Sequence, residues 1–222
     1  MIKNYKDSII TKIARLFFLI TCTYGTTDYC LPKEIVNHNN TFYGSKYIYL
    51  TNICLYITVT CLFMGNMVRQ LRVQGLLEIY RHTLCLMLPL NCLVSILFWT
   101  LFYIDPTLIR DKDLYNKNIR ISLFSDLCVH LFPFLSLLVE HKGLIIKSHP
   151  CHCIFYILFT VTYYFICYYF SKLNNMWVYP LLGKLDLKNR ILLFFFSTIL
   201  VIFIYKMMMY FIKNEHENLN KY

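Results

Sequence analysis

Charged residues are scarce in this chain of 222 residues. Asp, Glu, Lys and Arg together make up 15% of it, whereas a soluble domain typically carries about 25%. Hydrophobic residues reach 58%, and the mean hydropathy is +0.49. This composition excludes an ordinary soluble domain. It indicates a polytopic membrane protein that consists of helices and short loops.

Several motifs that define enzyme classes are also missing. The sequence has no glycine-rich phosphate loop, no Gly-x-Ser-x-Gly nucleophile elbow and no His-Glu-x-x-His zinc motif. It has no internal repeat and no low-complexity segment. His149, Cys151, His152 and Cys153 are metal-ligand types, but zinc needs four ligands in suitable geometry and these form one short run. We therefore expect no metal and no other cofactor.

The net charge of +10 does not indicate a nucleic-acid partner. Lys and Arg stand in clusters between apolar segments, where such side chains reach for the headgroup region and contact anionic lipids. The ten cysteines do not indicate a secreted disulfide framework, because six of them lie inside apolar runs. There they are expected to act as small packing residues. The lipid bilayer is therefore the partner that the composition predicts.

Six apolar segments approach the length of about 20 residues that crosses a bilayer. They cover residues 9–26, 47–67, 83–103, 119–139, 151–170 and 191–212. The predicted fold class is therefore all-α, with one transmembrane domain (1–222) that forms a bundle of about six helices. Lys12 and Arg15 interrupt the first segment, which also resembles a signal peptide. We favour a retained helix because no small-residue cleavage pattern follows.

The membrane orientation is not readable from charge. The basic residues of the two sets of loops nearly balance, so the positive-inside rule does not decide between the two orientations. Because the first helix usually dominates, we expect both ends in the cytoplasm.

The fourth segment carries an unusual polar stripe. At about 100° per residue, one third of the helix circumference holds Ser122, Asp126, His130, Pro133, Ser136 and Glu140. An ionisable residue at membrane depth costs about 2.5–3.5 kcal/mol on insertion scales and usually faces the bundle interior. His130 is therefore the first candidate functional residue. Glu140 ends the segment and is expected at the membrane interface.

Four stretches together resemble one known family. They are Lys46-Tyr-Ile-Tyr-Leu-Thr51, Phe98-Trp99 with Asp105, Asp126-x-x-x-His130-x-x-Pro133 and Trp177-Val-Tyr-Pro180. In order and spacing these blocks are similar to those of the androgen-induced and androgen-dependent transmembrane proteins. That small six-helix family hydrolyses fatty acid esters of hydroxy fatty acids. The resemblance implies a divergent member in the endoplasmic reticulum or another endomembrane, with a lipid ester as substrate.

The resemblance also implies the catalytic residues. Thr51 matches the proposed nucleophile near the start of the second helix, and His130 matches its histidine partner in the fourth. The vertebrate members carry Asn-His a few residues before that histidine, where this chain has Ser125-Asp126-Leu127. Such departures place the natural substrate in question.

The chemistry of these residues is coherent. A threonine hydroxyl becomes a nucleophile when a base takes its proton, and neutral histidine is the usual base near pH 7. Asp126, one turn before His130, would orient the imidazole, or else pair with Arg81 or Arg120. Arg81 is a candidate donor to the oxyanion.

Each of these residues also has a structural interpretation. A membrane threonine often bonds its own helix backbone, and a membrane histidine often joins two helices by a hydrogen bond. Two functions therefore follow from the sequence. The first is an intramembrane lipid ester hydrolase that uses Thr51 and His130. The second is a non-enzymatic multi-pass protein, a small transporter or scaffold, with a polar path through the membrane.

Overall fold

The computed structural model describes residues 8–71, 73–142, 144, 146 and 148–219, and these residues form helices and loops without strands. Five helices are long and apolar enough to cross a membrane. They are α1 (Ile9–Thr26), α3 (Leu50–Gln70), α4 (Leu77–Ile104), α8 (Pro150–Asn174) and α10 (Leu187–Leu219). The pair α6 (Leu123–His130) and α7 (Phe132–Glu140) is apolar enough as well, and it brings the number to six if the two helices form one bent span. The all-α, polytopic fold class is confirmed.

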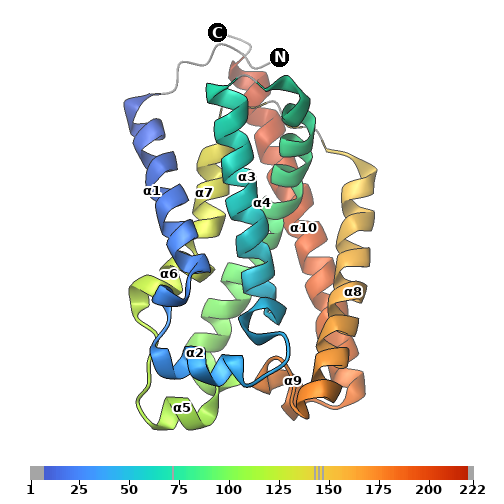
Figure 1. Cartoon of the computed structure of the whole chain (residues 1–222). Coiled ribbons are helices and arrows are strands. Elements are labelled where there is room, and N and C mark those ends of the chain that lie inside the picture. Colours follow the sequence, from blue (N-terminus) through green and yellow to red (C-terminus); the bar gives the residue numbers. More distant parts are fainter. Residues whose placement is uncertain (1–7, 72, 143, 145, 147, 220–222) are drawn as a thin grey trace.

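The long helices stand side by side in an up-and-down bundle (Figure 1). Helix α4 packs against α3, α7 and α10, while α1 packs against α3, α6 and α7, and α8 packs against α10. The start of α1 and the end of α10 lie at one end of the bundle (Figure 1). The other end, called the loop end below, holds the short helices α2 (Lys33–Asn40), α5 (Lys112–Asn116) and α9 (Pro180–Lys184). Single 3-10 turns are Asp28–Cys30, Ser45–Ile48, Gln74–Leu76 and Pro106–Leu108.

Helix α4 contains a proline whose effect on the backbone is compensated. Pro89 has no N–H, so the carbonyl of Cys85 one turn earlier loses its helical partner. The hydroxyl of Tyr156 on α8 donates to this carbonyl at 3.2 Å and to the carbonyl of Leu86 at 3.1 Å. Because an unpaired carbonyl in lipid is costly, this tyrosine fixes α8 against the middle of α4.

The fourth span is broken, which corrects the expectation of one continuous helix over 119–139. Residues 119–122 are not helical, and α6 begins at Leu123 with the Ser122 hydroxyl as its N-cap. The span then bends by 44° at Leu131. Pro133 explains the break because it removes one helical N–H and its ring clashes with the preceding turn. The Ser95 hydroxyl of α4 donates to the carbonyl of His130 beside the bend.

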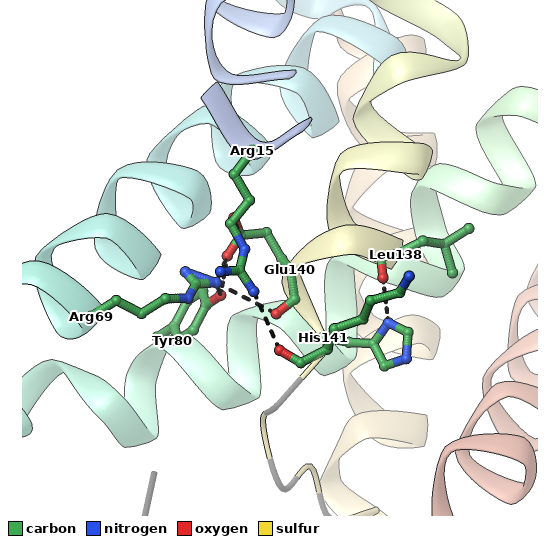
Figure 2. Close-up of polar contacts among 7 residues, drawn as sticks. Arg15, Arg69, Tyr80, Leu138, Glu140 and His141 are labelled. Carbon is green, nitrogen blue, oxygen red and sulfur yellow. Dashed lines mark hydrogen bonds and ion pairs between the residues drawn. The ribbon is translucent and has the colours of Figure 1, made fainter. Parts of the chain in front are cut away.

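A buried ion-pair cluster joins four helices at the end opposite the loop end (Figure 2). The Glu140 carboxylate pairs with Arg69 of α3 and with Arg15 of α1 at 3.6 Å, and it accepts a hydrogen bond from Tyr80 of α4. The Glu140 residue is only 1% exposed, so its carboxylate is buried between the helices. We call Glu140, Arg15, Arg69 and Tyr80 the Glu140 cluster. Its carboxylate balances the charge that Arg15 brings into the first apolar segment.

Candidate functional site

A cavity of about 320 Å³ lies at the loop end of the bundle. Its walls come from α3, α4, α6, α8 and α10, and α2, α5 and α9 contribute to its rim. Aliphatic and aromatic side chains line most of it, as in ligand pockets generally. Its polar residues include Thr51, Asn52, Arg110, Asp111, Asp126 and His130.

Thr51 lies in the first turn of α3, and this turn is held by two distant tyrosines. Tyr49, the residue at the N-cap position, has no side-chain hydrogen bond to the helix. Instead the backbone N–H of Leu50 donates to the hydroxyls of Tyr163 at 2.8 Å and Tyr179 at 3.1 Å. The Tyr163 hydroxyl in turn donates to the carbonyl of Ile48. The position of Thr51 is therefore set from α8 and from the loop before α9.

The same turn presents hydrogen-bond donors to the cavity. The N–H groups of Thr51 and Asn52 belong to the first turn, where no carbonyl of the helix is available to them. The Thr51 side chain interacts with the hydroxyl of Tyr179, and burial raises the pKa of this phenol, so it stays protonated. Partial positive charge at the helix N-terminus favours an anion at this place.

His130 lies at the end of α6, just before the bend. Its ring stacks on Phe98 of α4 with a centroid distance of 3.3 Å and an interplanar angle of 7°. Its Nε2 lies 3.9 Å from Oδ1 of Asp126, while its buried Nδ1 has no hydrogen-bond partner among the described residues. The imidazole is therefore held in place, and one of its nitrogens is buried without a hydrogen-bond partner among the described residues.

Asp126 pairs with an arginine that the sequence did not single out. Its Oδ2 lies 2.5 Å from a terminal nitrogen of Arg110, whose guanidinium also lies over the Phe102 ring at 5.1 Å. The expected partners were Arg81 and Arg120, and neither fills this role. Arg81 pairs with Glu78 at 2.5 Å.

The structure places three of the four residues selected from the sequence in the lining of one cavity. Thr51, His130 and Asp126 all line the cavity, and no hydrogen bond joins Thr51 to His130 directly. Arg81 is not part of the lining, because it lies near the start of α4, at the opposite end of the bundle.

Sequence reasoning missed Arg110, Tyr163 and Tyr179. Only Tyr179 had a signal, because it stands in the Trp-Val-Tyr-Pro block that carried part of the family resemblance. Among the residues that the structure describes, no group of three or more His, Cys, Asp or Glu could hold a metal ion.

Helices long and apolar enough to cross a membrane define the chain as a polytopic membrane protein, and a largely apolar cavity lies between them. The family model described as FAR-17a/AIG1-like protein matches residues 13–213, and the chain belongs to this family. This confirms the resemblance inferred from the sequence blocks. The chain is also 26% identical over 187 residues to the UPF0641 membrane protein PJ4664.05 of Schizosaccharomyces pombe (strain 972 / ATCC 24843), covering 78% of this chain and 80% of that protein. No solved structure matches.

Proposed function

We propose that this protein is an intramembrane lipid ester hydrolase that uses Thr51 as nucleophile and His130 as general base. The observation that carries the proposal is the shared cavity. Thr51 comes from α3, and His130 and Asp126 come from α6, about 80 positions later, yet all three line one apolar pocket. A fatty acid ester of a hydroxy fatty acid, or a similar lipid ester, matches this combination of apolar walls and a few polar groups.

The reaction follows the general logic of acyl transfer. Thr51 Oγ attacks the ester carbonyl while its proton passes to His130. The resulting imidazolium gives that proton to the departing alkoxide as the carbon–oxygen ester bond breaks. In the second half, a water gives its proton to His130 and its oxygen attacks the acyl-threonine. The carboxylic acid leaves, and the proton returns to Thr51 Oγ.

Three features of the site support this assignment. First, the stacking of His130 on Phe98 fixes the imidazole plane. Second, Asp126 lies beside Nε2, where a carboxylate stabilises the imidazolium that forms during attack. Third, the first-turn amides of α3 and the Tyr179 hydroxyl are donors for the oxyanion, which replaces the expectation for Arg81. Donors of this kind act strongly where water is excluded.

The alternative function, a polar path for transport, needs polar groups along the whole depth of the membrane. The cavity lining contains Asp126 and His130 but neither Ser136 nor Glu140 from the same stripe. Glu140 is instead occupied by the Glu140 cluster. The hydrolase therefore accounts for the distribution of polar groups better than the path does.

Ester hydrolysis by purified protein in lipid nanodiscs tests the proposal. We expect Thr51→Ala to abolish both ester cleavage and labelling by a fluorophosphonate probe. We expect His130→Gln to lower kcat/KM by about 10²- to 10⁴-fold. Thr60→Ala is the matched control, because Thr60 lies on the same helix, is exposed, and donates only to the carbonyl of Tyr56. A Thr51→Ala protein that hydrolyses esters at the wild-type rate contradicts the proposal, as does a wild type that hydrolyses none.

The membrane that the protein occupies is part of the same proposal. A lipid hydrolase of this family belongs in the endoplasmic reticulum or another endomembrane, where lipid esters are made and turned over. Fluorescence microscopy of the tagged chain tests this location. A signal confined to the cell surface would contradict it.

A further inference from the structure

The cavity has an apolar arm that extends from Thr51 towards the middle of the bundle. Helices α4, α8 and α10 form its walls, and its far end is made by Leu90, Tyr156 and Val201. These three residues are 3%, 0% and 1% exposed, so the arm is closed there. Tyr156 is further held by its hydrogen bonds to the α4 backbone. The arm therefore ends at a buried floor and is a pocket rather than a channel.

The register between α3 and α4 gives the depth of this arm. Asn91 donates to the hydroxyl of Thr58 at 2.9 Å, so these two residues lie at the same level. Leu90, at the floor, is the neighbour of Asn91. Thr51 lies seven residues before Thr58 on α3, which is about 10 Å along the helix axis. The floor therefore lies about 10 Å from the level of Thr51.

We propose that this arm holds the acyl chain of the ester and that the side chain at position 201 sets the longest chain accepted. The inference rests on the proposed function for the seating of the ester carbonyl at Thr51. An extended chain advances about 1.2 Å per single bond, so about eight bonds fit between Thr51 and the floor. The substrate class is thus a lipid ester whose acyl arm is of medium length, or is bent beyond its eighth bond.

Photolabelling tests the arm without requiring hydrolysis. Purified protein is exposed to saturated fatty acids that carry a diazirine at the chain end, in a series of increasing length. The labelled residues are then mapped by mass spectrometry. We expect labelling at the floor residues to be strongest for chains of about eight to ten carbons. The same protein is assayed with p-nitrophenyl esters of matching lengths.

Two substitutions at position 201, with a control elsewhere on α10, test whether the arm sets the preferred acyl length. Val201→Phe fills the far end of the arm, so we expect the preferred acyl chain to be about two carbons shorter than in the wild type. For the acyl length that the wild type prefers, we expect kcat/KM to fall about tenfold or more for each methylene that no longer fits. Val201→Ala shifts the optimum in the opposite direction. Ile199→Phe is the matched control, because Ile199 is 49% exposed and does not line the cavity. Thermal unfolding in detergent verifies that each variant is folded.

The outcomes distinguish the two proposals. If the chain length that best labels the floor residues changes with the side chain at position 201, but the protein cleaves no ester, the acyl pocket is supported and the hydrolase is refuted. Ester cleavage with the same length optimum in wild type, Val201→Phe and Val201→Ala refutes the acyl pocket and leaves the hydrolase. Labelling without a length optimum, or an optimum that Ile199→Phe shifts equally, also refutes the acyl pocket.

Discussion

Removing the carboxylate of Glu140 is expected to destabilise the bundle far more than removing an exposed carboxylate. Its side chain is 2% exposed and faces two arginines, whose side chains are 6% (Arg15) and 16% (Arg69) exposed. Glu140→Ala removes the charge that balances both guanidiniums and leaves the Tyr80 hydroxyl without that acceptor. Breaking a buried pair by deleting one partner typically costs about 3–5 kcal/mol.

A surface pair provides the matched control. Glu78 contacts Arg81 at 2.5 Å, a shorter distance than that between Arg15 and Glu140, but its side chain is 68% exposed. Exposed pairs of this kind contribute about 0–1 kcal/mol because water and salt screen them. Glu78→Ala therefore tests whether burial, rather than the presence of an ion pair, determines the free energy of unfolding.

The assay is reversible unfolding in mixed micelles, followed by circular dichroism, for both variants and the wild type. If Glu140→Ala costs no more than Glu78→Ala, the reasoning about burial is wrong. A third protein makes the test stricter. Replacing Arg15 and Arg69 by Met together with Glu140→Leu should restore most of the lost stability, because apolar residues often replace a buried charged cluster at little cost.

Two further predictions concern single side chains. A Cβ added at Gly65 would lie 2.7–2.8 Å from three side-chain atoms of the Glu140 cluster, whereas one at Gly75 would meet nothing within 4 Å. Gly65→Ala should therefore cost about 1–3 kcal/mol in unfolding free energy, and an effect no larger than that of Gly75→Ala would contradict this. At the end of α4, hydrogen bonds from the Thr107 hydroxyl and backbone N–H lower the pKa of the Asp105 carboxyl. A lowered pKa in the folded state means that the contribution to stability is present at neutral pH and is lost as the pH falls through that pKa. Thr107→Val should raise the pKa of Asp105 in an NMR titration, and an unchanged titration would contradict this.

The helices could be predicted from the sequence because lipid imposes a simple requirement on length and polarity. Five of the six apolar segments correspond to single helices of spanning length, and the fourth corresponds to the bent pair α6 and α7. The break in the fourth was visible only as Pro133. Proline within α4 leaves that helix unbroken, so the residue type alone does not decide the outcome.

The candidate site was predictable only in part. Thr51 and His130 were found through sequence blocks, and Asp126 through its helical spacing from His130. Arg110 was missed because it lies in a loop, where a cation has no periodic signal. The partners of Glu140 were not predicted, because they come from three other helices and no local pattern records a tertiary pairing of this kind.

The two tyrosines that hold the first turn of α3 have a consequence for biosynthesis. Helix α3 is made early, and N-terminal segments generally fold first during synthesis. Its first turn, however, is completed by hydroxyls at positions 163 and 179. The helix can therefore enter the membrane long before Thr51 acquires its final geometry. A chain that ends before Tyr163 would have the helix without the hydrogen bonds that complete its first turn, so the proposed site would form only once α8 and the loop before α9 are in place.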